Sequence, residues 1–410
     1  MDNNISKAFI WNTLGSGVYL GCLWLLNILV VRFGSYSEAG ILSLAISIAN
    51  VVQSVSLAGI RNYQVSDVKE RYSNYTYICV RYITASIAFA GCIFFLLINA
   101  YSRYQVLCII GMSVYRMIDA LTDVYHGILQ KKWRLDIVGK ALAIRGVLIV
   151  SVFITILSIG KDLLLAIIGM TVVSFAEFIV FELRKTKKVD SIIRKVNKND
   201  IISLLIYSIP LTIYSTLLNA ITVVTRYYIE AICGEELLGY YASISSPAII
   251  VQVAATYIFT PLVGVFAELY RTGDKRKFDK LIIKCLGLVS VIIVCALICC
   301  QYLGDWGLQL LFGKEILKHS YLLQPIVIST ALMAVILFLS MLLIVVRNMK
   351  ILVFGNLVGF LINVVFAPVL IRKYNMQGAN YILILSLLID MIILSIGLRY
   401  SEKRTMKSEK

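Results

Sequence analysis

The chain has 410 residues, of which 60% are hydrophobic and only 15% are charged, and its mean hydropathy is +0.86. A soluble protein of this size carries about 25% charged residues, so the composition excludes a soluble enzyme or binding domain and indicates a polytopic membrane protein. The net charge of +16 does not indicate nucleic-acid binding, because the basic residues stand in short runs between apolar segments, where they set membrane orientation.

Apolar windows of about 20 residues predict an all-α protein with about twelve transmembrane helices. The first apolar run is too long for a signal-peptide core and lacks a cleavage site, so we expect it to remain as the first helix. The predicted helices cover residues 8–31, 40–60, 75–100, 104–130, 137–160, 163–183, 201–228, 238–262, 281–303, 320–346, 351–371 and 379–398. The divisions near 101–103 and 161–162 rest on very short connections.

Lysine and arginine gather in the loops on one side of this predicted bundle. The richest are the 61–74 loop, KKWR (131–134), the run 184–198, RTGDKRKFDK (271–280) and the tail SEKRTMKSEK (401–410). Loops rich in these two residues stay in the cytoplasm. Both termini are therefore expected to be cytoplasmic, which agrees with an even number of helices.

Two segments in the two halves of the chain resemble each other: FGSYSEAGILSLAISIANVVQSV (33–55) and CGEELLGYYASISSPAIIVQV (233–253). With a one-residue gap, the aligned pairs are Gly34 with Gly234, Gly40 with Gly239, Ser47 with Ser246 and Gln53 with Gln252. We therefore expect two six-helix bundles related by a pseudo-twofold axis along the membrane normal. The predicted domains are an N-terminal bundle (1–183), a basic cytoplasmic linker (184–200), a C-terminal bundle (201–398) and a cytoplasmic tail (399–410).

No loop is long enough to carry a catalytic domain, and the sequence has no phosphate-binding loop, HExxH motif or nucleophile elbow. No pair among the nine cysteines has metal-ligand spacing. We therefore expect no catalytic residue, no metal site and no cofactor.

The most informative stretch is SVYRMIDALTDVYHGIL (113–129), which carries four ionisable residues inside a predicted helix. At 100° per residue, Arg116, Asp119, Asp123 and His126 fall within an arc of about 80°. A charge at the bilayer centre costs at least roughly 2.5–3.5 kcal/mol on insertion scales, so this face must meet other helices or a polar cavity. The two alternatives are an ion-pair network that fixes the fourth helix and a stripe that lines a binding site.

Three segments resemble the Wzx-type polysaccharide flippases of the multidrug/oligosaccharidyl-lipid/polysaccharide (MOP) exporter superfamily: WNTLGSGVYL (11–20), AGIRNYQVSDV (58–68) and IPLTIYSTLLNAITVVTRYYIEAICGEELLGYYA (209–242). This resemblance implies two six-helix bundles around a central cavity in a bacterial inner membrane. It also implies that the protein moves an undecaprenyl-pyrophosphate-linked oligosaccharide, such as an O-antigen or capsule unit, from the cytoplasmic to the periplasmic leaflet. Contacts with the polysaccharide polymerase machinery are left open.

A pyrophosphate headgroup calls for basic residues, and arginine binds phosphate oxygens in pairs without losing its proton. The predicted substrate-binding residues are the bases inside or at the edges of the helices: Arg61, Arg81, Arg116, Lys140, Arg145 and Arg226. Each of these residues also has a possible structural role that involves no substrate. Arg61 could be a helix cap, Arg226 an interfacial anchor, and Arg81 and Lys140 side chains that reach the cytoplasmic headgroups.

The predicted proton- or ion-coupling residues are Asp119, Asp123 and Asp390. Arg116 can pair with Asp119 one helical turn away, and we expect Asp123 to pair with His126 or with a base on the fifth helix. If Asp119 neutralises Arg116, the positive charge for the substrate must come from elsewhere, above all from Arg145 and Arg226. Asp390 is either a proton carrier or the partner of an arginine.

Two other functions remain open. One is a multidrug or small-cation exporter of the same superfamily, which the five intramembrane bases disfavour because a cationic substrate would need acids instead. The other is a membrane glycosyltransferase or polymerase, which the short loops disfavour.

Overall fold

The computed structural model of the chain describes residues 3–67, 70–160, 162–190 and 197–405. These residues form helices and their connections, with no strand among them, as the sequence predicts. Two compact units divide the chain, residues 1–219 and 220–410. Residues 191–196 of the predicted linker and 406–410 of the predicted tail lie outside the described part of the chain.

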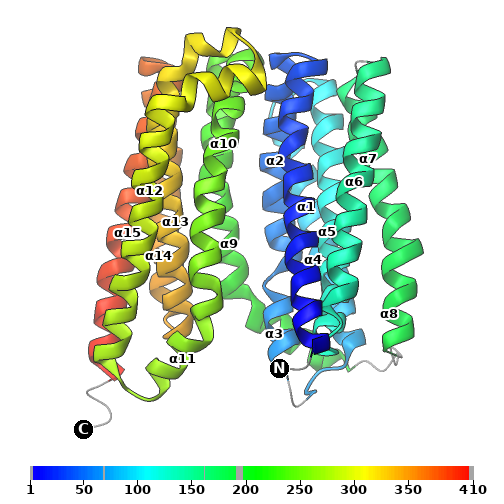
Figure 1. The fold of residues 1–410 in the computed structure, drawn as a ribbon, viewed down its shortest axis with the longest axis vertical. Coiled ribbons are helices and arrows are strands. Elements are labelled where there is room, and N and C mark those ends of the chain that lie inside the picture. The colour runs from blue at the N-terminus through cyan, green and yellow to red at the C-terminus, as the bar shows by residue number, and fades with distance from the viewer. Residues whose placement is uncertain (1–2, 68–69, 161, 191–196, 406–410) are drawn as a thin grey trace. The chain divides into compact units, whose positions relative to one another are not determined.

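Unit 1 contains the elements drawn from blue to green in Figure 1. They are α1 (Asn3–Phe33), α2 (Tyr36–Leu57), α3 (Ile60–Ser66), α4 (Asn74–Ile98), α5 (Arg103–Lys131), α6 (Leu135–Gly160), α7 (Leu163–Glu177), the π-helical turn η1 (Phe178–Leu183), α8 (Arg184–Val189) and the first part of α9 (Lys198–Cys233).

Unit 2 contains the rest of α9 and the elements that follow it. They are α10 (Glu235–Phe259), the 3-10 turn η2 (Thr260–Leu262), α11 (Val263–Arg271), α12 (Lys275–Phe312), the 3-10 segment η3 (Glu315–Leu322), α13 (Leu323–Val345), α14 (Met349–Tyr374) and α15 (Met376–Thr405).

Within the described residues, twelve helical stretches are long and apolar enough to cross a membrane, which confirms the predicted number. Most extend beyond the apolar windows, because capping interactions and not hydropathy set where a helix ends. The ninth, expected over 281–303, covers Lys275–Phe312. Asp274 caps its N-terminus by accepting from the Lys277 N–H, and Gly313, at φ 96°, follows its C-terminus.

The connection near 101–103 is as short as predicted, since α4 ends at Ile98 and α5 begins at Arg103. Ser102 caps α5 by accepting from the Gln105 N–H, while the Gln105 side chain accepts from the Ser102 N–H. This capping box satisfies two backbone donors that an open helix end would leave unpaired.

The region predicted as the 61–74 loop is partly helical, which corrects the sequence interpretation. The backbone turns left-handed at Ala58 (φ 44°) and Gly59 (φ 61°), so α2 ends there, and α3 then continues to Ser66. The buried Ile60 and Gln64 hold α3 against its neighbours. Arg61 therefore lies on a short separate helix that packs against α5, within the last part of the second candidate membrane span, Tyr36–Ser66.

Close helix contact in unit 1 depends on glycine. α1 and α6 lie side by side (Figure 1), and a Cβ atom added to Gly15 would overlap the backbone of Gly139. A Cβ added to Gly139 would in turn overlap the backbone of Trp11. Small residues permit such close approach between membrane helices. The contact brings Tyr19 of α1 within reach of the charged residues of α5.

The first half of α9 belongs to unit 1 through several contacts. Leu204 is fully buried in the core cluster that includes residues of α3, α4 and α5. The Tyr63 hydroxyl donates to the Tyr207 carbonyl at 2.9 Å, and the Asn219 amide donates to the Ser54 hydroxyl at 3.2 Å. The boundary between the units therefore falls inside α9, after residue 219, and not within the basic linker.

Candidate functional site

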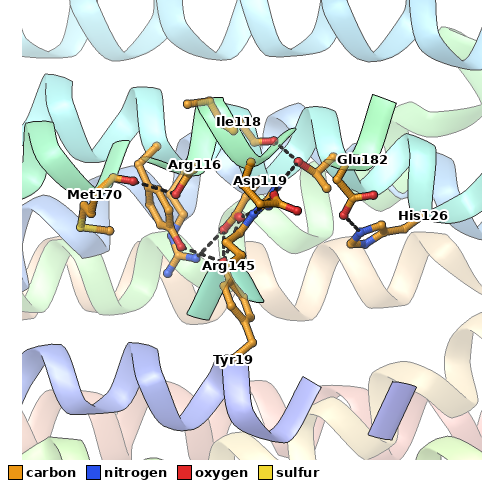
Figure 2. Close-up of polar contacts among 12 residues, drawn as sticks. Tyr19, Arg116, Ile118, Asp119, His126, Arg145, Met170 and Glu182 are labelled. Atoms are coloured by element: carbon orange, nitrogen blue, oxygen red, sulfur yellow. Dashed lines mark hydrogen bonds and ion pairs between the residues drawn. The ribbon is translucent and has the colours of Figure 1, made fainter. Parts of the chain in front are cut away.

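The charged stripe of α5 faces other helices of unit 1. Asp119, Asp123 and His126 each bind a side chain from another element, and Arg116 binds Asp119 on α5 itself. Figure 2 shows Arg116, Asp119 and His126 pointing toward side chains from α1, α6 and η1. The stripe is therefore the centre of a buried charge network, which the next paragraphs describe from one end to the other.

At one end of the network, two arginines share the carboxylate of Asp123. Arg61 donates to Oδ1 at 2.8 Å, and Arg81 donates to Oδ2 at 2.9 Å. Arg81 is fully buried and also donates to the Ser56 carbonyl at 2.7 Å. Arg61 remains 32% exposed and donates to the Gln130 side chain as well. We call Arg61, Arg81 and Asp123 the basic end.

In the middle of the network, Asp119 accepts from three side chains. Arg116 donates to it at 3.2 Å, Arg145 at 3.1 Å and the Tyr19 hydroxyl at 2.9 Å. The Tyr19 hydroxyl also lies 2.7 Å from that of Tyr115. Two charged donors and one neutral donor offset the desolvation of this carboxylate, which is only 8% exposed.

Arg145 connects Asp119 to α7. Its Nε and Nη2 donate to Oε2 of Glu177 at 2.9 and 2.7 Å, and Nη2 also donates to the Thr122 hydroxyl at 2.8 Å. The arginine side chain is 2% exposed and all three of its nitrogens have partners. Charge-assisted hydrogen bonds of this kind are about twice as strong as neutral ones.

At the other end, His126 Nε2 lies 2.5 Å from Oε1 of Glu182. Glu182 lies on the π-helical turn η1, five residues after Glu177. In an α-helix, residues five apart point about 140° away from each other. Hydrogen bonds in a π turn join residues i and i+5, so both carboxylates can point toward α5 and α6. The middle of the network and this end together carry more acids than arginines, and we call them the acidic end: Arg116, Asp119, His126, Arg145, Glu177 and Glu182.

These contacts decide the pairing predictions. The Arg116–Asp119 pair is confirmed. The expected partner of Asp123 is wrong, because α3 and α4 supply Arg61 and Arg81 to it, while His126 reaches Glu182 on η1. These partners lie on other helices, so the spacing along α5 could not identify them.

Three of the predicted site residues lie outside this network. Lys140 is exposed on α6, with its ammonium 5.1 Å from the centre of the Trp11 ring. Arg226 lies on the part of α9 that belongs to unit 2. There it interacts electrostatically with Tyr241, whose hydroxyl donates to the buried Asn380.

The third is Asp390, on α15 in unit 2. It is fully buried, and within the described part of the chain neither of its carboxylate oxygens has a hydrogen-bond partner. Gly355 and Gly359 of α14 pack against it, and a Cβ added to Gly355 would lie 2.7 Å from Oδ1. Of the two alternatives left by the sequence, the arginine partner is absent among the described residues.

The sequence prediction missed Tyr19, Thr122 and Glu182 as members of the network, whereas Glu177 stood out as an acid that could be the partner of an arginine, and it binds Arg145. Glu182 precedes the basic run RKTKK and therefore resembles an ordinary residue at the edge of a membrane helix. The one signal was two acids five residues apart in a predicted span. In the described residues, no group of three or more His, Cys, Asp or Glu side chains is arranged to hold a metal ion.

Comparisons with solved structures identify the fold of this protein. The lipid II flippase MurJ in an inward closed conformation superposes with a TM-score of 0.72 at 14% identity, over 96% of this chain and 87% of that one. An outward-facing multidrug resistance MATE family transporter of the MOP superfamily superposes with a TM-score of 0.66 at 12% identity, over 98% of this chain and 96% of that one. A MOP superfamily transporter from Pyrococcus furiosus superposes with a TM-score of 0.67 at 14% identity, over 99% of this chain and 96% of that one.

The chain thus has the fold of the MOP superfamily transporters, and it is a multi-pass membrane protein, as the sequence resemblance implied. No protein-family model matches the chain. In sequence it is similar to the capsular polysaccharide biosynthesis protein CapF of Staphylococcus aureus, at 24% identity over 397 residues, which covers 96% of this chain and 98% of that protein.

Proposed function

We propose that this protein is a flippase that moves an undecaprenyl-pyrophosphate-linked oligosaccharide from the cytoplasmic to the periplasmic leaflet of a bacterial inner membrane. The observation that carries the proposal is the similarity to a capsular polysaccharide biosynthesis protein over almost the whole of both chains, together with the MOP fold. Alternating access needs no covalent step, so the protein would act as a transporter and not as an enzyme. The cargo would be a capsule or O-antigen repeat unit.

The network suggests which predicted bases meet the pyrophosphate. Arg81 and Arg145 are almost fully buried, and their guanidinium groups already bind carboxylates. Arg61 and Arg116 keep 32% and 15% of their side-chain surface exposed. We therefore assign direct phosphate contact in unit 1 to Arg61 and Arg116, and a positioning role to Arg81 and Arg145. Arg226, half-buried in unit 2, is proposed separately as a phosphate contact. Lys140, exposed on α6, would act at the headgroup region.

We also propose Asp390 as a coupling residue. A buried carboxyl group without a described partner is costly as an anion, so it favours either a bound proton or a bound cation. Asp119 and Asp123, the other predicted coupling residues, each bind two guanidinium groups, so a proton there would have to disrupt ion pairs. Their proposed contribution is to hold the arginines in place.

The alternative function is export of a multidrug or small-cation substrate, which the MATE neighbours support at the level of fold. A cation would need an acid that is free to bind it. In the unit 1 network, the described carboxylates of Asp119, Asp123 and Glu177 already bind arginines, which disfavours a cationic cargo at these three residues.

The deciding experiment is deletion of the gene in its host, followed by assay of the lipid-linked repeat unit in each leaflet. The flippase proposal predicts loss of surface glycan and complete repeat units retained in the cytoplasmic leaflet. Unpolymerised units in the periplasmic leaflet would instead indicate a polymerase. An unchanged glycan would contradict the proposal and favour a small-molecule exporter.

A further inference from the structure

The charge network of unit 1 is locally unbalanced at both ends. The basic end has two arginines and one carboxylate. The acidic end has two arginines, three carboxylates and one histidine. Opposite charges attract strongly in a low-dielectric interior. A local excess of one sign of charge is compensated best by a group of the opposite sign in direct contact. Each end therefore lacks one charge, a negative one at the basic end and a positive one at the acidic end.

Glu182 carries the excess negative charge of the acidic end. Asp119 binds Arg116 and Arg145, and Glu177 binds Arg145. Glu182 is 1% exposed, and its Oε2 has no hydrogen-bond partner among the described residues. The side chain that contacts its Oε1 is His126, which is neutral or cationic depending on one proton.

Among the residues that the structure describes, no other buried positive charge is in contact with the pair. From α6 and α7 the facing groups are Arg145 and Glu177, and these two bind each other. On α5, Asp119 and Asp123 bind arginines. The four bases that α8 contributes are all exposed: Arg184, Lys185, Lys187 and Lys188.

The backbone gives an independent indication that this carboxylate has a function. The π turn η1 interrupts an otherwise α-helical span, and such turns occur frequently at functional sites. Without it, Glu182 would point about 140° away from Glu177 and could not share the same face. The turn thus lets a second acid face the interior of unit 1 beside Glu177.

We infer that His126 and Glu182 together form the binding site for a single exchangeable proton. With the proton bound, the pair is an imidazolium and a carboxylate, or an imidazole and a carboxylic acid, and has no net charge. After release to water it is an imidazole and a carboxylate with one negative charge. The proton supplies the positive charge that the acidic end lacks.

The link to transport rests on the proposed function. An anionic headgroup at Arg61 would supply the negative charge that the basic end lacks. Once it binds, the network as a whole has a negative excess unless a proton binds at the acidic end. The two binding events therefore promote each other, as reciprocal linkage requires. This pair would carry the coupling proton in unit 1, in addition to Asp390 in unit 2.

Direct detection of the proton does not depend on transport. The chain has two histidines, so the full-length protein with ¹⁵N-labelled histidine gives signals from two imidazole rings, and His319 on η3 is the internal reference. In lipid nanodiscs, we expect an imidazolium signal for His126, or an infrared band of a protonated carboxyl that disappears in Glu182→Gln. The signal of the bound proton should be lost in Glu182→Gln and partly restored in Glu182→Asp.

A neutral His126 between pH 5 and 9 in the unmodified protein, with no carboxyl band assignable to Glu182, would overturn the proton site. Coupling is tested separately by adding undecaprenyl pyrophosphate in weak buffer. Proton uptake by the unmodified protein, lost in Glu182→Gln, is the expected result. If the titration occurs but the lipid causes no uptake, the proton site stands and the link to an anionic cargo is wrong.

Discussion

Arg145 donates to a single oxygen of Glu177 through both Nε and Nη2, and each of these side chains is 2% exposed. Two charges from different helices thus meet in the interior of unit 1. Breaking such a pair leaves a buried charge uncompensated, which typically costs about 3–5 kcal/mol, whereas replacing both partners by apolar residues is often neutral.

We therefore expect Arg145→Leu to lower the stability of the protein by about 3–5 kcal/mol, since Glu177 and Asp119 both lose a donor. Thermal unfolding in detergent measures the effect. The double variant Arg145→Leu/Glu177→Leu should recover part of the loss. Equal losses in the single and double variants would show that the pair does not hold α6 and α7 together.

Arg61 and Arg81 bind the same carboxylate but should respond differently to substitution. Arg61→Gln should change the stability by less than about 1 kcal/mol, because Arg61 is partly exposed and Arg81 still binds Asp123. It should nevertheless reduce flipping of the lipid-linked oligosaccharide in proteoliposomes. Arg81→Gln should destabilise the protein, since Asp123 and the Ser56 carbonyl both lose a buried donor. Normal transport by a well-folded Arg61→Gln protein would remove Arg61 from the binding site.

The glycine contact between α1 and α6 gives a steric prediction. Gly15→Ala should destabilise the protein by about 1–3 kcal/mol, because its Cβ would overlap the Gly139 backbone and separate the helices. Gly17→Ala is the matched control on the same helix, since nothing lies within 4 Å of its added Cβ. Comparable melting temperatures for the two variants would contradict the close contact.

Asp67, outside the membrane spans, predicts a dependence of stability on pH. Burial raises the pKa of this carboxyl, but hydrogen bonds from the Tyr72 and Arg71 N–H groups and the Tyr77 hydroxyl, and the charge of Lys131, lower it further than burial raises it. The net pKa is below its ordinary value. Ionised Asp67 therefore stabilises the fold above its unfolded-state pKa, and this contribution is lost as the pH falls through the folded-state pKa.

Asp67→Asn should accordingly lower the melting temperature at neutral pH and flatten its decrease at acidic pH. Glu268→Gln is the control, because the pKa of Glu268 is also lowered, by Arg271, but the side chain is exposed. A profile for Asp67→Asn parallel to that of the unmodified protein would refute the role of these hydrogen bonds.

Asp390 should be dispensable for folding and required for coupling. Because no described group pairs with its carboxylate, Asp390→Asn should be at least as stable as the unmodified protein. Transport in proteoliposomes should lose its response to an imposed proton or cation gradient. Asp305→Asn, which changes an exposed acid of unit 2, should keep that response. A gradient response retained by Asp390→Asn would exclude Asp390 as the coupling residue.

Sequence periodicity predicted the parts of this structure that depend on one helix at a time. Hydropathy gave twelve spans, and the 100° rotation per residue placed Arg116, Asp119 and Asp123 on one buried face. The partners of these residues depend on which helices pack together, so no spacing along α5 could reveal that Arg81 binds Asp123. The π turn that directs Glu182 inward has no signature in the residue types that form it.

The division of α9 between the two units bears on how this gene could be cut or recombined. The basic run before α9 has the composition of an interdomain linker. The segment after it, up to Asn219, nevertheless completes the core of unit 1. A fragment ending at residue 190 would therefore lack Leu204, with Ile201 and Leu205 beside it, and expose the apolar surface that they cover. A chimaera joined within the basic linker would separate the hydrophobic core of unit 1 from the first part of α9, which completes it. A chimaera joined within α9, after residue 219, would keep the core of each unit intact.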